Sequence, residues 1–458
     1  MIRNGKKKAI SCALVAAMSV GLAACGTTSY DFKVSYDGIK TGDVSSKVSV
    51  HDPSILKADG EYYIFGSHMS AAKSSDLLNW EKVADGYSKK NPVYGQIYDV
   101  ADEAFAYSGS KNSLIKTDDK QVHVWAPDVI YNETTGLYYM YYCTTSTWNA
   151  SNLCYGTSTT PEGPYEWQGA LIYSGFNRKT ISGTDVLDYV DEDYAYKNYI
   201  KGAQYNYEDY PNAIDPTVFY DADGRMWMVY GSWSGGIFLL EIDKTTGLVI
   251  HPEADKANNV DPYYGKRLLG GGHISIEGPY IMYDEASGYY YLFVSYGALT
   301  SNGGYQVRVF RSKTVDGEYV DMNGKYPEKS AQHQNFGLKL TGNYKLPSLE
   351  KAYMATGHNS AFVDDDGRMY LVYHTRFNDN GEGHSPRVHQ MLVNEDGWPC
   401  ELPYQTQGET VNKDGYDTDD IIGRYYVINQ GTAIDSKIAN PVILYLEKNG
   451  KVKGEKSE

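Results

Sequence analysis

The sequence predicts an all-β fold, a five-bladed β-propeller over residues 44–403. Three observations lead to this prediction: the chain holds 45 tyrosines among 458 residues, one glycine-led pattern recurs five times, and a short strand precedes each copy. A tyrosine ring packs well on the pleated surface of a half-buried strand while its hydroxyl reaches a polar partner. Hydrophobic residues make up 41% of the chain, which is enough for a large core.

The recurring pattern is a glycine followed by alternating aromatic and aliphatic residues. Its five copies occupy residues 60–67, 136–142, 224–232, 288–295 and 367–374. The shorter strands that precede them, each across a turn rich in Asp, Asn or Gly, lie at 53–56, 127–130, 216–219, 279–282 and 360–363. Each pair predicts a hairpin, and each interval leaves room for two more strands. Radial repetition of four-stranded sheets is the propeller arrangement, which protects the sheet edges.

Two long loops interrupt the repeat, near residues 86–118 and 173–210. Loops of this length are usually functional or disordered, and we expect both to lie on one face of the propeller.

Residues 1–24 have the features of a signal peptide rather than of a folded element. Arg3 and Lys6–Lys8 form a basic region, and residues 9–24 are an apolar run that is short for a membrane span. The run ends at Ala24-Cys25, which resembles a bacterial lipobox. We therefore expect an exported protein that a lipid on Cys25 anchors at the cell surface, or that is released outside the cell. Residues 25–43 form a lead segment.

The repeating pattern stops after Pro399. Residues 404–458 are predicted to be a linker, polar and acidic over residues 404–424, and part of a β-rich C-terminal module, because a hairpin pattern surrounds Asn449-Gly450. A piece of this size cannot bury a core of its own, so we expect it to dock on the propeller or to begin a longer module.

The charge and the cysteines limit the partners and the chemistry. The formal net charge of −16 argues against a nucleic-acid partner. Cys143 and Cys154 flank a predicted hairpin loop, where a disulfide and two free buried thiols both remain open. We expect a monomer.

The innermost strand of each propeller blade runs beside the central axis, so equivalent positions on these strands form a ring. Asp52, Asp215, Glu277 and His358 stand at the heads of four such strands and are expected to converge. Three carboxylates in one cavity repel one another, so at least one should hold a proton at neutral pH. A protonated acid beside an ionised carboxylate is what cleavage of a glycosidic bond requires. The alternative is that each Asp only caps a turn before proline.

Taken in order, the motifs at these strand heads resemble those of family 43 glycoside hydrolases, and most of all the endo-acting 1,5-α-L-arabinanases. The motifs are His51-Asp52-Pro53-Ser54, Trp125-Ala126-Pro127-Asp128, Asn212-Ala213-Ile214-Asp215-Pro216, Gly231-Ser232-Trp233, Ile276-Glu277-Gly278-Pro279 and Gly357-His358-Asn359-Ser360.

The resemblance implies residue roles. Asp52 matches the general base that activates water, Glu277 the general acid, and Asp215 a third carboxylate that raises the pKa of the acid and orients the sugar. These enzymes invert the anomeric centre, which implies a base and an acid about 6.5–9.5 Å apart. His358 matches a histidine that helps to hold a calcium ion, mostly through water.

The expected substrate is plant cell-wall arabinan or its oligosaccharides. The expected sugar contacts are Asp52, Trp125, Asn212, Ala213, Ile214, Asp215, Gly231, Ser232 and Trp233. We expect Asp128, which is offset from the ring by two residues, to have a structural role.

Two other functions remain open at this point. One is an exo-acting α-L-arabinofuranosidase or β-xylosidase on the same scaffold, which a pocket closed by the 173–210 loop would favour. The other is a glycan-binding propeller without catalysis, which predicts that an acid or a base is missing.

Overall fold

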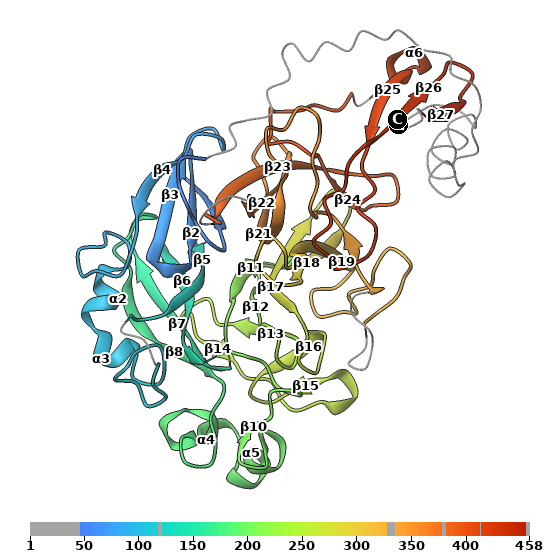
Figure 1. Cartoon of the computed structure of the whole chain (residues 1–458). Helices are drawn as coiled ribbons and strands as arrows, with labels where there is room; N and C mark the ends of the chain where they lie inside the picture. The colour runs from blue at the N-terminus through green and yellow to red at the C-terminus, as the bar shows by residue number, and fades with distance from the viewer. Residues whose placement is uncertain are drawn as a thin grey trace.

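The computed structural model describes residues 46–117, 121–147, 149–327, 335–377, 382–412 and 414–454. These residues form a five-bladed β-propeller with a small β-rich C-terminal part, as predicted (Figure 1). The predicted signal peptide, the lipobox at Cys25 and the lead segment to residue 43 lie outside the described residues.

The blades follow one another along the chain. Blade 1 consists of β1 (Ser54–Ala58), β2 (Glu61–Gly66), β3 (Ser70–Ser74) and β4 (Glu81–Ala84), with the 3-10 helix η1 (Ser67–Met69) after β2. Blade 2 consists of β5 (Val124–Asn132), β6 (Leu137–Thr147), β7 (Ala150–Ser158) and β8 (Glu166–Tyr173). Blade 3 consists of β11 (Thr217–Tyr220), β12 (Met226–Tyr230), β13 (Ile237–Ile242) and β16 (Gly265–Leu269), extended by β14 (Val249–Ile250), η3 (Lys256–Asn258) and β15 (Val260–Asp261).

The last two blades complete the ring. Blade 4 consists of β17 (Ile276–Asp284), β18 (Tyr289–Tyr296), β19 (Gln306–Ser312) and β20 (Leu338–Lys339). Blade 5 consists of β21 (Met354–Val363), β22 (Met369–Arg376), β23 (Ser385–Val393) and β24 (Pro399–Glu401). Strands within each blade pair antiparallel, and a single parallel pair, Gln306 with Thr356, links blades 4 and 5. The five predicted hairpins are the first two strands of each blade.

The hydrophobic core lies between blades. Side chains of β6 alternate, so that Tyr139 and Tyr141 pack towards blade 3 while Met140 and Tyr142 pack towards blade 1. Three further clusters fill the interfaces of blades 3 and 4, blades 4 and 5, and blades 5 and 1. The tyrosine-rich second strands therefore have two buried faces, which explains their continuous aromatic and aliphatic runs.

Side chains also tie neighbouring innermost strands together. Ser54 of blade 1 donates to the carboxylate of Asp128 in blade 2, and Asp128 accepts the backbone N–H of Val218 in blade 3 at 2.6 Å. Thr217 donates to the carbonyl of Pro279 in blade 4 at 2.7 Å. Burial raises the pKa of Asp128 to about 7 despite these two donors. Asp128 thus bridges three blades and does not line the central cavity.

The ring closes between blade 5 and blade 1. Ser360 donates to the carbonyl of Pro53 at 2.9 Å, and Tyr62 donates to Asp364 at 2.5 Å. Lys57 pairs with Asp364 and Asp365 at the outer part of this seam. Within the described residues, both blades are built from continuous stretches of chain, so side chains rather than a shared strand close the ring.

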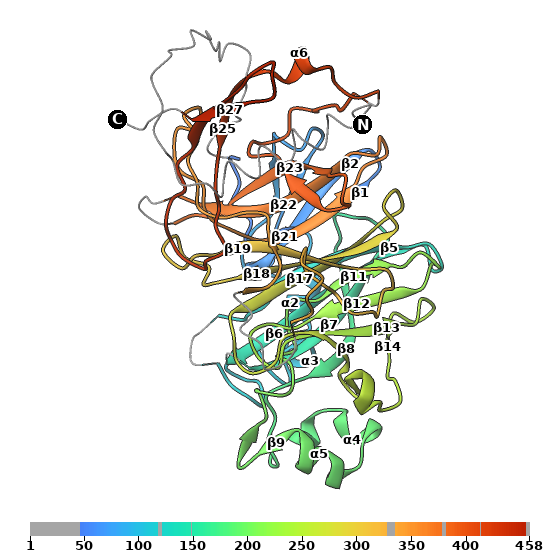
Figure 2. The ribbon, with the colours of Figure 1, turned by 90° about the vertical axis from the view of Figure 1, so that its right-hand side faces the viewer.

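The two long loops contain short helices. The first holds α2 (Gly95–Asp99) and α3 (Ala101–Ala104). The second holds η2 (Ile181–Gly183), α4 (Val186–Tyr189), α5 (Glu192–Asn198), β9 (Ile200–Lys201) and β10 (Gln204–Tyr205). Figures 1 and 2 show α4 and α5 at the end of the molecule opposite to the C-terminal sheet. No helix in the described part of the chain is both long and apolar enough to cross a membrane.

The C-terminal part is a three-stranded antiparallel sheet that packs on blade 5. The sheet consists of β25 (Gly423–Val427), β26 (Val442–Leu446) and β27 (Val452–Gly454), and the short helix α6 (Thr418–Ile421) precedes it. β26 and β27 form the hairpin predicted around Asn449-Gly450, whereas α6 and the start of β25 lie in the segment predicted as linker. Tyr344 and Tyr353 pack with Tyr426 and Ile428, so this sheet shares its core with the propeller.

Cys143 and Cys154, for which the sequence leaves a disulfide open, are both free thiols. Cys143 pairs in register with Leu153, and both belong to the cluster facing blade 3. Cys154, the next residue, belongs to the cluster facing blade 1. Because successive side chains of a strand point to opposite faces, the sheet separates the two sulfurs.

The bridge at Asp128 predicts a large loss of stability for Asp128→Ala. The substitution leaves the Ser54 hydroxyl and the Val218 N–H buried without their acceptor, so the free energy of unfolding should fall by about 2–4 kcal/mol. Urea unfolding measures this change. Asp85→Ala is the control, because Asp85 and its partner Lys82 are 63% and 66% exposed and removal of such a pair costs about 0.5 kcal/mol or less. Equal small losses for both variants would contradict the bridging role.

Candidate active site

A cavity of about 440 Å³ opens at the heads of the innermost strands. It is lined by His51, Asp52, Ser67, His68, Trp125, Asn212, Ile214, Asp215, Ser232, Trp233, His273, Glu277, Leu299 and His358. The structure therefore brings together Asp52, Asp215, Glu277 and His358, which come from four different blades.

The backbone bends where each innermost strand begins. Asp52 and Asp215 have φ of 55° and 56°, in the left-handed region. β17 has a register shift between Glu277 and Tyr280, and β5 has one between Trp125 and Asp128. Irregularities of this kind re-aim side chains, and here they turn the head of the strand towards the axis. The X-Pro steps at these heads fit the bends, because proline cannot donate to a sheet ladder.

Asp52 is an ionised carboxylate among histidines. Burial opposes its charge, but His51 Nε2 and His358 Nδ1 lie 3.1 Å and 3.2 Å from its Oδ1. Ser67 donates to Oδ2 at 2.6 Å. These neighbours outweigh burial and lower the pKa of Asp52 to about 2. His374 Nδ1 accepts the backbone N–H of Asp52 at 3.3 Å, which anchors the residue to blade 5.

Glu277 is held through both of its oxygens. Trp233 Nε1 donates to Oε2 at 2.6 Å, and Tyr305 Oη donates to Oε1 at 2.6 Å. Burial raises the pKa of Glu277 and the negative charge of Asp52 adds to this, while the Tyr305 and Trp233 hydrogen bonds and His358 act in the opposite direction. Glu277 therefore keeps its proton to higher pH than an exposed glutamate.

Asp215 lies beside the other two acids. Burial, with the charges of Glu277 and Asp52, raises the pKa of Asp215 to about 7, although His358 acts against this rise. The backbone N–H of Gly278 donates to its Oδ2 at 3.1 Å. The same three carboxylates raise the pKa of His358 against the effect of its burial. The cavity thus contains one ionised acid, two acids of raised pKa and one imidazole that favours its protonated form.

The predicted sugar contacts are mostly at the cavity. Trp125, Asn212, Ile214, Ser232 and Trp233 line it together with the acids.

Two of the predicted contacts are not among the lining residues. Ala213 is fully buried. Gly231 shapes the turn before Trp233, because a Cβ there would lie 2.5 Å from the carbonyl oxygen of Gly236.

Sequence reasoning missed several residues of the site. Tyr305 contacts Glu277 from the segment before β19, and His68, His273 and Leu299 line the cavity. None of them belongs to a repeated motif, so no local pattern marks them. Only the packing of loops from different blades brings them to the axis.

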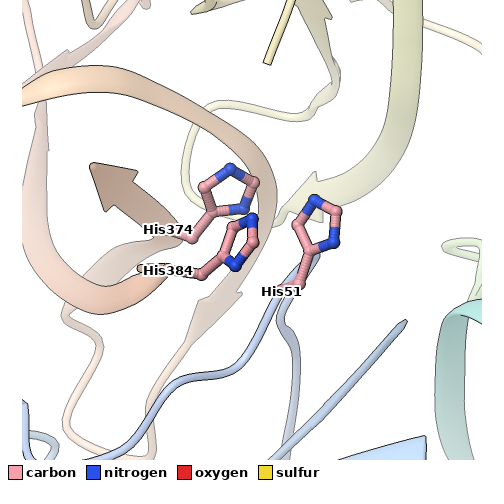
Figure 3. Close-up of side chains that lie close together, drawn as sticks. All are labelled: His51, His374 and His384. Atoms are coloured by element: carbon pink, nitrogen blue, oxygen red, sulfur yellow. The ribbon is translucent and has the colours of Figure 1, made fainter. Parts of the chain in front are cut away.

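Three histidines, His51, His374 and His384, lie together (Figure 3), and the first two of them contact Asp52. Their ligand nitrogens are within 4.8 Å of one another, which is close enough for the group to hold a metal ion. In the present arrangement, the rings of His51 and His384 are stacked with centroids 3.9 Å apart, and Arg376 donates to His384 Nε2 at 2.6 Å. Burial lowers the pKa of His51 to about 4 and that of His384 to about 3, so both are neutral imidazoles.

Comparisons with known proteins agree with this architecture. The chain matches the profile of glycosyl hydrolases family 43 over residues 44–209 and 191–399, and that of a C-terminal lipocalin-like domain over residues 403–458. It is 39% identical to an extracellular endo-α-(1→5)-L-arabinanase of Thermotoga petrophila over 88% of this chain and 81% of that protein. It is 36% identical to extracellular endo-α-(1→5)-L-arabinanase 2 of Bacillus subtilis over 90% of this chain and 82% of that protein.

A solved structure shows the same fold. The crystal structure of endo-1,5-α-L-arabinanase from Thermotoga petrophila RKU-1 superposes with a TM-score of 0.75 at 38% identity, covering 90% of this chain and 86% of that one.

A propeller with three carboxylates and two tryptophans in its axial cavity is the architecture of a glycosidase. The chain belongs to glycosyl hydrolases family 43.

Proposed function

We propose that this protein is an endo-acting 1,5-α-L-arabinanase that hydrolyses arabinan with inversion at the anomeric carbon. The relatives named above support the substrate. The observation that carries the proposal is the unequal protonation of neighbouring acids: the pKa of Asp52 is about 2, while that of Glu277 is raised. One base and one acid are thereby available at the same pH.

The proposed roles follow from this electrostatic difference. Ionised Asp52 takes a proton from the attacking water, and protonated Glu277 gives its proton to the departing glycosidic oxygen. Asp215, whose own pKa is about 7, can accept hydrogen bonds from sugar hydroxyls, and in its ionised form it would add negative charge beside Glu277 and raise the pKa of the acid. His358 Nδ1 lies 3.2 Å from Asp52 Oδ1 and stabilises the negative charge of Asp52. The protonation of this imidazole can change together with that of the three acids.

We also propose that His358 helps to hold a calcium ion in the cavity. The carboxylates around His358 are the hard oxygen donors that calcium prefers, and calcium binding there would displace the imidazole proton. The ion would supply a fixed positive charge and ordered water near the acids. The triad of His51, His374 and His384 offers only nitrogen donors, so it does not fit calcium.

We also propose that a lipid on Cys25 tethers the protein after export, as a monomer at the cell surface. The relatives named above are extracellular, which supports export.

The products of wild-type digestion test the proposed activity. Linear 1,5-α-arabinan should lose viscosity early and release oligosaccharides of mixed length, because an endo-acting enzyme cuts within the chain. Proton NMR should detect the β-anomer first, as inversion requires. Arabinose as the sole early product would favour the exo-acting alternative, and an initial α-anomer would overturn inversion.

Loss of either proposed catalytic group should nearly abolish turnover. Asp52→Ala and Glu277→Ala should each lower kcat by roughly 10²–10⁴-fold, the usual contribution of general acid–base catalysis. Calorimetry should still detect oligosaccharide binding by both variants. Asp85→Ala, on the exposed surface, is the matched carboxylate control and should keep wild-type activity. Near-normal turnover by either active-site variant would contradict its role.

Tyr305→Phe should move the alkaline limb of the pH–rate profile to higher pH. Tyr305 donates to Glu277 and so favours the ionised form, which means that its loss raises the pKa of Glu277 further. The acidic limb should stay at low pH, because the pKa of Asp52 is about 2. Tyr296→Phe is the control, since the buried Tyr296 hydroxyl has no hydrogen-bond partner. An unmoved alkaline limb in Tyr305→Phe would show that this contact does not tune the acid.

A further inference from the structure

The insertion at residues 173–210 contributes no lining residue to the described cavity, yet its last residues reach the rim. The backbone N–H of Gly272 donates to the carbonyl of Glu208 at 2.7 Å, and Arg267 Nη2 donates to that of Asp209 at 2.5 Å. The rings of Tyr207 and His273 meet edge to face, with centroids 5.7 Å apart. The end of the insertion therefore supports the loop that carries His273.

The same loop contacts the turn that carries Trp233. Gly235 donates its backbone N–H to the carbonyl of Gly272 at 2.9 Å, and Ser234 forms an isolated bridge with His273. The rings of Trp233 and His273 lie 5.5 Å apart at an angle of 44°. Two cavity-lining rings are thus fixed relative to each other, one by blade 3 and one through the insertion.

We propose that Trp233 and His273 bind the arabinofuranosyl unit on the leaving-group side of the scissile bond, and that the insertion sets this site by holding His273. This inference rests on the proposed function, in which Glu277 protonates the departing oxygen. Trp233 donates its Nε1–H to Glu277 at 2.6 Å, so the sugar beside this ring is the one that leaves.

The chemistry of the two rings suits a furanose. Flat aromatic faces pack against sugar C–H groups, and an imidazole adds a donor and an acceptor for hydroxyls. His273 is exposed, so its ring needs a support in order to be pre-organised for the sugar. Tyr207 supplies that support, which reduces the conformational entropy lost when the sugar binds.

Tyr207→Ala and His273→Ala test the proposal through two substrates of equal donor length. Arabinohexaose places sugars on both sides of the scissile bond, whereas arabinotriosyl fluoride has a leaving group without a ring. We expect the ratio of kcat/KM for the hexaose to that for the fluoride to fall roughly 3- to 10-fold in both variants, as the loss of one aromatic contact implies. Thermal unfolding should show that both variants remain folded.

Tyr196→Ala is the matched control, because Tyr196 lies in the same insertion but packs over Arg178, with its ring centroid 4.3 Å from the guanidinium. It should leave the ratio unchanged. An unchanged ratio in Tyr207→Ala and His273→Ala, or an equal loss on both substrates, would overturn the inference. Failure of the proposed function gives a different result in the wild-type protein, since a protein without this activity would hydrolyse neither substrate and an exo-acting enzyme would release only arabinose from the hexaose.

Discussion

The structure depends on packing between blades rather than on any one sheet. Each blade buries both faces, and the hydrogen bonds of Ser54, Asp128 and Thr217 link the innermost strands where they approach the axis. Ser54 and Asp128 join through their side chains, and Asp128 and Thr217 each join to the backbone of the next blade, so these links fix the relative positions of the innermost strands along the axis. The acids of the cavity come from different blades and stand at strand heads, so they can converge only when these positions are fixed.

The electrostatics of the cavity follow from this convergence. Burial raises the pKa of all three acids. His51, His358 and Ser67 act on Asp52 specifically and keep it ionised. The pKa values of Glu277 and Asp215 stay raised because a second negative charge in the cavity would have no comparable compensation. An uneven supply of imidazole and hydroxyl partners therefore gives chemically similar carboxyl groups different pKa values.

Much of the fold could be predicted from the sequence because its signals are local. The glycine-led repeats gave all five hairpins, and the strand heads identified Asp52, Asp215, Glu277 and His358 as residues that meet. Tyr305 and His273 could not be found in this way, since loops from other parts of the chain place them. The state of Cys143 and Cys154 depended on the register of β6 and β7, which composition does not determine. The segment predicted as linker contains the exposed helix α6 and the start of β25, and β25 packs through Tyr426 on a core that residues before and after the first strands of blade 5 supply.

The seam between blade 5 and blade 1 has a consequence for the newly made chain. Asp52 meets His358 and His374 across this seam, and the contact between Asp52 and His374 spans 322 residues of sequence. During synthesis, Asp52 is made early, whereas His358, whose imidazole favours its protonated form, and His374, which accepts the backbone N–H of Asp52, leave the ribosome much later. Until these histidines are in place, burial of the Asp52 charge is unfavourable, so the buried position of Asp52 at the head of blade 1 is not stabilised. The arrangement around Asp52 is thus completed only when blade 5 packs against blade 1, and a chain that stops before blade 5 lacks these two contacts.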